Sequence, residues 1–214
     1  MKIKWFGQSS FMMTSENGTK IVTDPYADFL GYKLPGIEAD IVSTSHDHRD
    51  HNNIGAVKGR FEHIREPGRF SNCGIEINGV ETFHDNVSGA KKGKNIVYTF
   101  AMDQIKVCHC GDLGHVLSSG QIKDIGKVDI LLLPVGGSFT INASDAFQVM
   151  KQLNPAIVIP MHYRTKALGL MGHVFGKVDD FIAIAGMKAT KYKELEVNKE
   201  NINEYAGIAV LEYN

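Results

Sequence analysis

Long hydrophobic runs are absent from this sequence. The longest apolar stretches, such as Ile130 to Val135, suit a buried strand and fall far short of the roughly 18 residues that a membrane-spanning helix requires. The N-terminal segment Met1 to Phe6 includes two lysines and leads into no apolar segment with a small-residue cleavage site, so we expect no signal peptide. Both absences predict a cytoplasmic protein that does not enter a membrane.

Cysteine is scarce. The three cysteines, Cys73, Cys108 and Cys110, are an odd number at spacings that match no disulfide scaffold, so we expect free thiols in a reducing compartment. Cys108 and Cys110 lie two residues apart on an expected strand and therefore share a face. A metal bound by these two thiolates would need further ligands, and the only candidate beside them, Asp112, is assigned to another site below.

Neither sign of charge is in excess. The sequence has 23 Lys and Arg against 24 Asp and Glu, a formal net charge of −1, so it offers no global basic field and we expect no nucleic-acid partner. Internal repeats, low-complexity tracts and Pro/Ser-rich linkers are also absent. With 214 residues, of which 43% are hydrophobic and 22% charged, the chain is predicted to form a single globular domain over residues 1–214.

Short apolar runs between turn signals predict many β-strands. Asn17-Gly18 lies between two of these runs, and this dipeptide favours a tight hairpin turn. Strands are expected at Lys2–Phe6, Phe11–Thr14, Lys20–Thr23, Ile41–Thr44, Ile75–Ile77, Val80–Phe83, Ile96–Phe100, Ile105–Cys108, Ile130–Leu133, Ile157–Ile159 and Ile208–Leu211. Helices are expected at Asn52–Val57, Ser119–Ile125, Ala143–Leu153 with Ser144 as its N-cap, and Val178–Met187. This order predicts an α/β (α+β) fold in which two mixed sheets pack together with helices outside.

Histidine is the residue type that stands out, with nine in the chain, three of them in one segment. That segment, Ser45-His46-Asp47-His48-Arg49-Asp50-His51, directly follows an expected strand. Imidazole and carboxylate ligands suit zinc, manganese, iron and related ions, and so dense a polar cluster would be hard to satisfy in an ordinary core. We expect His46 and His48 to reach one metal from the end of the strand. Asp50 and His51 would turn toward a second.

The pattern His46-x-His48-x-Asp50-His51 resembles the H-x-H-x-D-H signature of the metallo-β-lactamase superfamily. The resemblance covers about residues 1–165 and implies a four-layer αββα sandwich, two mixed β-sheets flanked by helices. It also implies a third histidine for the first metal, a bridging aspartate and a last histidine for the second metal, and an early aspartate that supports the ligands. The matching residues, in chain order, are Asp24 for the supporting role and His46, His48, Asp50, His51, His84, Asp112 and His162 for the metals.

Finer features resemble the ascorbate-6-phosphate lactonase-like branch of that superfamily. They are the short length, His84-Asp85, the loop with Gly89, Gly93 and Asn95, Gly111-Asp112-Leu113-Gly114, and Ile159-Pro160-Met161-His162-Tyr163. One departure is Gln8, which stands where the branch often has histidine; an amide forms hydrogen bonds but does not act as an acid or base near neutral pH. Members of the branch often assemble, so a homo-oligomer is left open.

The resemblance implies a metal-dependent hydrolase with two divalent ions, zinc in first place and Mn, Fe, Co or Ni as alternatives. A hydroxide bridging the two metals would attack the carbonyl carbon or phosphorus of an ester-type bond, in a lactone or a phosphodiester. Asp50 and Asp112 are the predicted catalytic carboxylates, and Asp50 would orient the hydroxide and pass its proton to the leaving group. Four metal charges against two carboxylates and neutral histidines leave the site positive, so we expect a small anionic substrate.

Several alternatives stay open. The segment Asn86–Asn95, with Lys91, Lys92 and Lys94, is either a solvated loop or a positive flap that contacts a substrate phosphate. A di-iron oxidoreductase of the same fold typically has glutamate at the position of His48, and a non-catalytic metal-binding protein would have lost ligands. His63, His115 and His173 are expected at the surface or in hydrogen bonds, with His115 near enough to Asp112 to line the pocket, and His109 is not assigned.

Overall fold

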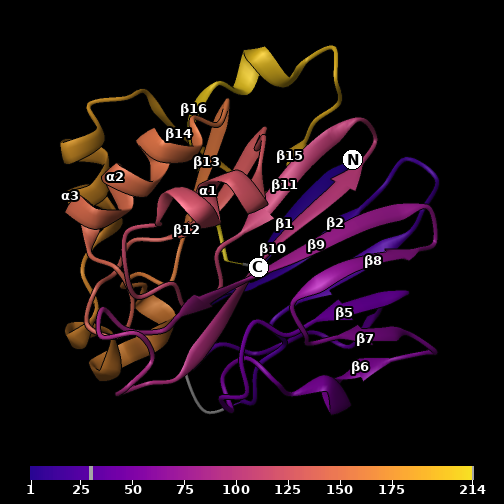
Figure 1. Ribbon diagram of the computed structural model, residues 1–214, viewed down its shortest axis with the longest axis horizontal. Helices are drawn as coiled ribbons and strands as arrows, with labels where there is room; N and C mark the ends of the chain where they lie inside the picture. Colours follow the sequence, from indigo (N-terminus) through magenta and orange to yellow (C-terminus); the bar gives the residue numbers. More distant parts are fainter. Residues whose placement is uncertain (29–30, 214) are drawn as a thin grey trace.

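Two large β-sheets face each other in the computed structural model, which describes residues 1–28 and 31–213 (Figure 1). The strands are β1 (Lys2–Gly7), β2 (Ser10–Thr14), β3 (Lys20–Thr23), β4 (Ile37–Glu38), β5 (Ile41–Ser43), β6 (Val57–Lys58), β7 (Glu62–Ile64), β8 (Gly68–Asn72), β9 (Ile75–Phe83), β10 (Lys94–Met102), β11 (Ile105–His109), β12 (Ile130–Pro134), β13 (Ile157–Met161), β14 (Ala189–Tyr192), β15 (Leu195–Glu196) and β16 (Gly207–Leu211). The α-helices are α1 (Ser119–Ile125), α2 (Ala143–Leu153) and α3 (Val178–Ala185), and the 3-10 helices are η1 (Ile54–Ala56), η2 (Lys166–Val174) and η3 (Ile202–Tyr205).

Both large sheets are mixed, as the sequence predicts. One has six strands in the order β15-β1-β2-β3-β5-β7, antiparallel up to β3 and parallel from there to β7. The other has eight strands in the order β14-β16-β13-β12-β11-β10-β9-β8. Its pairs are antiparallel from β8 to β11 and parallel from β11 onward. The remaining strands, β4 and β6, form a separate parallel pair.

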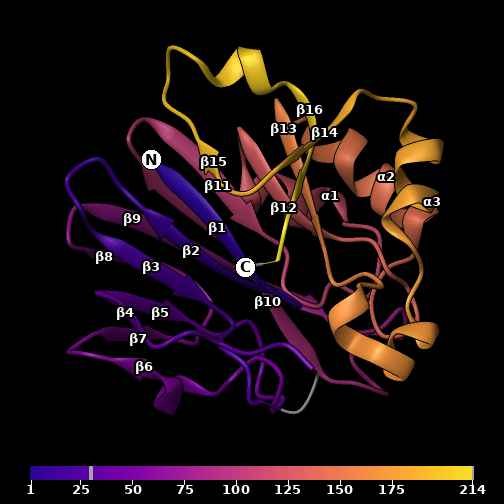
Figure 2. The ribbon, with the colours of Figure 1, turned by 180° about the vertical axis from the view of Figure 1, so that it is seen from behind.

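Strands β3 and β5 of the six-stranded sheet are buried on both faces, which explains why they carry consecutive apolar residues. Ile21 and Ile41 lie in the core between the two sheets, whereas their chain neighbours Val22 and Val42 belong to a second cluster on the outer face. Successive side chains of a strand point to opposite faces, so an apolar residue at every position indicates that both faces are covered. Figure 2 looks onto the outer side of this sheet.

The flanking layers differ in helix content. On the eight-stranded sheet, α1 packs against β9 and β10, α2 packs against β12, and α3 packs on α2. On the six-stranded sheet, the outer cluster is completed by residues from the η1 and η2 regions and by irregular segments such as the one around Tyr32. Every helix across residues 1–28 and 31–213 is too short or too polar to span a lipid bilayer.

The predicted elements are present, with four corrections. Asn142, not Ser144, caps α2, because its side chain accepts hydrogen bonds from the N–H groups of Ser144 and Asp145. Helix α3 ends at Ala185 rather than Met187, since Gly186 takes a left-handed backbone. The helix expected at Asn52–Val57 is only the turn η1, and the two strands expected within 75–83 are the single strand β9.

Candidate metal centre

The strand ends bring the predicted ligands to one place. The segment from His46 to His51 follows β5, His84 follows β9, Asp112 lies three residues after β11, and His162 follows β13. Strands β9, β11 and β13 run in the same direction in one sheet, so their carboxyl ends lie at one edge. Side chains that are far apart in the sequence therefore converge where the two sheets meet.

All seven predicted ligands fall into two clusters. The first holds His46, His48 and His84, and the second holds Asp50, His51, Asp112 and His162. Within each cluster, one candidate ligand atom per residue lies within 4.8 Å of the others. The structure thus brings the predicted residues together in the predicted grouping, with Asp112 in the second cluster, while their roles as ligands stay predictions.

Asp112 connects the two clusters. Its Oδ2 lies 3.3 Å from His84 Nε2 in the first cluster and 3.4 Å from His162 Nε2 in the second, and its Oδ1 lies 3.3 Å from His51 Nε2. The Ser9 hydroxyl donates to Oδ1 at 3.3 Å, and Asn95 Oδ1 accepts the Asp112 N–H at 2.9 Å. Asp112 as a whole residue is only 2% exposed. Its place between the clusters is the one that a bridging ligand would take.

Gly111 allows this approach. Its backbone has a φ of +54°, and a Cβ at this position would collide with Ser45 and with the Asn95 side-chain oxygen. Glycine has no Cβ and populates positive φ freely, so the chain can turn here and bring Asp112 against the histidines.

A second buried carboxylate, Asp24, orients one histidine of each cluster. Its Oδ2 accepts from His51 Nδ1 at 2.8 Å and from the Ser45 hydroxyl at 2.6 Å, and its Oδ1 accepts from the Ser45 N–H at 2.7 Å. Because the Ser45 hydroxyl donates to Asp24, it accepts from His46 Nδ1, 3.0 Å away. Each ring is thereby held with Nδ1 engaged and Nε2 directed into its cluster.

The Nε2 atoms of His46 and His51 fit a metal. Both are buried and have no hydrogen-bond partner within residues 1–28 and 31–213. Buried ring nitrogens are normally hydrogen-bonded, and metal-binding histidines typically donate their other N–H to a carboxylate or a similar acceptor. The donor set of imidazoles and carboxylates, braced by Asp24 and Ser45, therefore fits divalent transition-metal ions.

The surroundings of the clusters lower the pKa of Asp112 and of two histidines, His46 and His84. Burial raises the pKa of Asp112, but His162 and His51 outweigh it and hold this pKa well below its ordinary value. Burial lowers the pKa of His46 to about 3 and also lowers that of His84, so both rings are neutral, as ligation requires. His51 differs, because Asp112 and Asp24 overcome its burial and raise its pKa well above the usual range. It must lose a proton to bind a metal.

Gln8 takes a place at the centre that the sequence alone did not assign. Its Nε2 donates to Asp50 Oδ2 at 3.4 Å, and its backbone carbonyl accepts from the Trp5 indole at 3.1 Å and from the His162 N–H at 3.2 Å. Its side-chain oxygen is buried without a partner in the described part of the chain. The signal for this residue was its departure from the branch pattern.

The loop after β9 is held by Asp85. Its two oxygens accept four backbone N–H groups, from Val87, Gly89, Lys91 and Lys92, at 2.8–2.9 Å. Burial raises the Asp85 pKa, but these donors outweigh it and keep the pKa below its ordinary value. The loop is thus ordered around one carboxylate.

Other contacts of the centre have no local sequence signal. Ser9, Ser45 and Asn95 contact predicted ligands or their backbone, and the sequence analysis assigned no role to any of the three. His109, which was not assigned, lies between the sheets, where its Nε2 donates to the Ser9 carbonyl at 2.7 Å and its Nδ1 accepts from the Gly111 N–H. His63, His115 and His173 each have a hydrogen-bond contact outside the two clusters, with Thr44, with Phe83 and Val116, and with Arg164. The three cysteines are free thiols, as expected.

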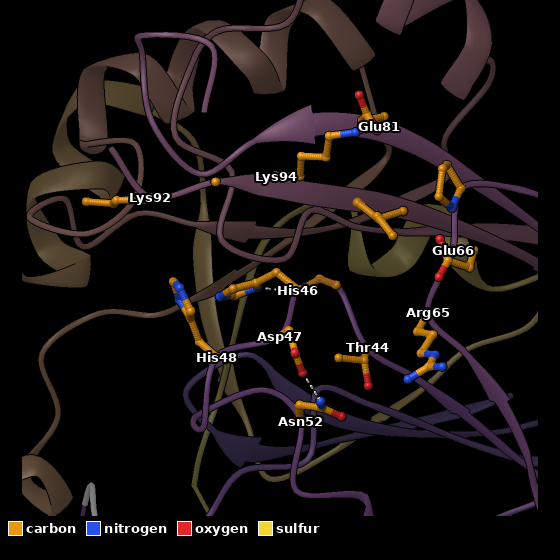
Figure 3. Close-up of a pocket in the computed structure, with 14 residues that line it drawn as sticks. Thr44, His46, Asp47, His48, Asn52, Arg65, Glu66, Glu81, Lys92 and Lys94 are labelled. Atoms are coloured by element: carbon orange, nitrogen blue, oxygen red, sulfur yellow. Dashed lines mark hydrogen bonds and ion pairs between the residues drawn. The ribbon is translucent and has the colours of Figure 1, made fainter. Parts of the chain in front are cut away.

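Two cavities adjoin the clusters. The larger, of about 690 Å³, is lined by His46 and His48 of the first cluster (Figure 3). The other, of about 500 Å³, is lined by His84 and His115. Residues of the first cluster therefore line both cavities, and Lys92 lies at the wall of both.

Comparison with known proteins identifies similar chains over nearly the full length. Residues 2–162 match the family model described as a beta-lactamase superfamily domain. A UPF0173 metal-dependent hydrolase of Thermoplasma acidophilum is 26% identical over 225 residues, covering 93% of this chain and 97% of that protein. Another, from Nanoarchaeum equitans, is 30% identical and covers 77% of this chain and 85% of that protein.

A protein of known structure is more similar in sequence to this chain than the two relatives above. The crystal structure of a protein from Thermotoga maritima, assigned to the metallo-β-lactamase superfamily as a Zn-dependent hydrolase, is 40% identical. It covers 99% of this chain and 98% of that one, with a TM-score of 0.82. The fold predicted from the sequence, two mixed sheets with flanking helices, is therefore confirmed. The narrower resemblance to the ascorbate-6-phosphate lactonase branch stays a prediction.

Proposed function

This chain belongs to the metallo-β-lactamase superfamily and to its UPF0173 metal-dependent hydrolase family, and from that premise we propose that it is a dinuclear metal-dependent hydrolase. Its reaction is the cleavage of an ester-type bond, in a lactone or a phosphodiester, and its substrate is small and anionic. The resemblance to the ascorbate-6-phosphate lactonase branch supports the lactone, and the two-metal arrangement suits the phosphodiester equally well. Zinc is the first candidate for the metal, since the relative from Thermotoga maritima is described as Zn-dependent.

The observation that carries the proposal is the position of Asp112 between two sets of ligand atoms. One carboxylate within 3.3–3.4 Å of histidine nitrogens from both clusters matches a pair of ions that share a ligand. His46, His48 and His84 would hold one ion, and Asp50, His51 and His162 the other. When bound, two such ions polarise the attacked group and lower the pKa of water to about 7.

Asp50 is the residue placed to move a proton. Burial raises its pKa, but the contact with His51 outweighs burial and brings the pKa to about 2, so the carboxylate is ionised at neutral pH. Gln8 Nε2, 3.4 Å from Asp50 Oδ2, restricts the rotation of the carboxylate. An ionised, oriented carboxylate can accept a proton from the nucleophile and deliver it to the leaving group. Asp112, enclosed by three histidines and Ser9, would bind the metal ions rather than transfer a proton.

The test is a substrate scan with chelator treatment and metal add-back. Purified protein is assayed against a lactone, a phosphodiester and a β-lactam, in parallel with His48→Ala and with His173→Ala as the matched control. His173 is an exposed histidine outside both clusters. We expect turnover of an ester-type substrate by the metal-loaded protein, its loss in His48→Ala and its retention in His173→Ala. Absence of turnover in every metal-loaded form, or near-normal turnover by His48→Ala, would contradict the proposal.

A further inference from the structure

Arg65 lines the cavity beside the first cluster, and it has no ion-pair partner among residues 1–28 and 31–213. We infer that Arg65 binds an anionic group of the substrate, a carboxylate or a phosphate, at a distance from the bond that is cleaved. This inference rests on the proposed function, because it places the reacting group at the metal centre. It assigns the substrate to molecules with two separated polar ends, one reacting and one anionic.

The cavity joins Arg65 to the centre. His46 and His48 line one side, and Arg65, Glu66 and Pro67, the residues between β7 and β8, line another. In Figure 3 the two histidine rings lie together, and the Arg65 side chain extends toward the side of the pocket where Thr44 lies. A volume of about 690 Å³ is within the range of small-molecule sites, so one ligand can contact the histidine side and Arg65 together.

The other basic residues of this cavity already have partners. Lys94 forms an ion pair with Glu81, 2.8 Å between Nζ and Oε2. Lys92 Nζ donates to the carbonyl oxygens of Ser138 and Phe139, at 3.2 and 2.8 Å, which fastens the loop after β9 to the loop before α2. These contacts occupy the side chains of Lys92 and Lys94, so Arg65 is the better candidate for an anion in this cavity.

Two of the three acidic residues of the cavity also have partners, and neither of them is paired with Arg65. Glu81 is paired with Lys94, and Asp47 accepts a hydrogen bond from the Asn52 amide. Three acidic and three basic side chains line the cavity, so their formal charges cancel. Which ligands bind there therefore depends on which of these side chains are not already paired within the protein. Arg65 and Glu66 have no ion-pair partner in residues 1–28 and 31–213.

The surroundings of Arg65 suit an anion. The Thr44 hydroxyl lies 2.9 Å from His63 Nε2, and burial together with the charge of Arg65 lowers the pKa of His63, which keeps this ring neutral. The positive charge at this end of the cavity is therefore that of the guanidinium. Guanidinium is planar and binds carboxylate or phosphate through two parallel hydrogen bonds. Arg65 is exposed, so its effect at a distance is screened, and recognition requires direct contact.

The experiment measures binding rather than turnover. Zinc-loaded protein is titrated in a calorimeter with α,ω-dicarboxylates of increasing chain length, with the monocarboxylates of matching length, and with ω-phosphonocarboxylates. The variants are Arg65→Gln, Arg65→Lys and Glu66→Gln. The matched control is Arg69→Gln, which removes the same charge from an exposed position on β8 outside the cavity.

We expect the best-fitting dianion to bind the unmodified protein about tenfold more tightly than its monocarboxylate, which is the gain of one further charged contact. Arg65→Gln should abolish this advantage, Arg65→Lys should keep part of it, Glu66→Gln should increase it and Arg69→Gln should leave it unchanged. The dianion series that gains more identifies the anionic group as carboxylate or phosphate.

Equal binding of dianions and monocarboxylates by the unmodified protein would overturn the inference, as would equal losses in Arg65→Gln and Arg69→Gln. The hydrolase proposal fails separately, through the substrate scan. An Arg65-dependent preference for dianions in a protein without turnover would support the binding site and contradict the reaction.

Discussion

The two clusters of the metal centre differ in how firmly the protein holds them. In the second cluster, Asp24 engages His51, Gln8 engages Asp50, and Ser9 engages Asp112. In the first cluster, Ser45 engages His46, while His48 is exposed and lines the larger cavity. The second cluster thus has more hydrogen-bonded support from the surrounding protein, whereas the first cluster faces the larger cavity through His46 and the exposed His48. Because Asp112 touches both, neither half is independent.

The largest effect is expected where the two halves meet. Asp112→Ala removes the shared carboxylate, so both clusters lose a neighbour within 3.4 Å and the substitution should disable both together. We expect kcat/KM to fall by about 10³-fold or more, equivalent to about 4 kcal/mol of transition-state stabilisation. Steady-state kinetics and the zinc content per chain are the measurements. A variant that keeps one tightly bound zinc and normal turnover would break the link between the clusters.

Next comes stability of the metal-free protein. His51→Ala leaves the carboxylates of Asp24 and Asp112 buried without their nearest cationic partner, and losing one member of a buried ion pair costs about 3 kcal/mol or more. His48→Ala removes an exposed side chain and should change the free energy of unfolding by only about 0.5 kcal/mol. Denaturant unfolding of chelator-treated protein measures both. Equal losses would show that burial does not distinguish the clusters.

A smaller effect is expected from the residue that braces one histidine of each cluster. Asp24→Asn keeps the size of the side chain but weakens its hold on His51 and Ser45, and losses of about 10–100-fold in metal affinity are typical for such supporting groups. Asp47→Asn is the matched control, because Asp47 is exposed and lies outside both clusters. Zinc competition with a chelating dye gives the affinities. Similar zinc affinities in the two variants would contradict a supporting role for Asp24.

The smallest effect is expected at Gln8. Gln8→Leu removes the amide contact with Asp50 but none of the seven clustered side chains. A net hydrogen bond to a charged group contributes about 1.5 kcal/mol or more, so kcat should fall by about tenfold while the zinc content is unchanged. Gln8→Glu tests the hydrogen bond from the Gln8 amide specifically, because an ionised carboxylate at this position cannot donate to Asp50. A fall in zinc content instead of kcat would mean that Gln8 supports binding rather than orientation.

The sequence predicts the strands of the core but not those of the rim. Ile130–Pro134 and Ile157–Met161 are buried at every position, and such runs are recognisable because the hydrophobic pattern is local. Strands β8 and β14 are largely exposed and have little apolar pattern, so their pairing with neighbours, not their composition, creates them.

The centre divides in the same way. The segment from His46 to His51 is recognisable in the sequence as a candidate metal site because it is dense in histidine and aspartate. The order of the later motifs then predicts His84, Asp112 and His162 as further ligands. The contacts that support these residues join parts of the chain far apart, such as Ser9 and Asp112, which are separated by 103 positions. A serine in the turn between β1 and β2 carries no sign of a partner so distant. Arg65 likewise has no sequence signal for a binding role, and only its position in the cavity suggests one.

The central claim is a pair of metals that share Asp112. Anomalous diffraction from crystals of the zinc-loaded protein tests it most directly. We predict two zinc peaks, roughly 3.5–4 Å apart, one beside His46, His48 and His84 and one beside Asp50, His51 and His162, with Asp112 contacting both. A single peak at full zinc loading, or two peaks of which neither contacts Asp112, would contradict the account.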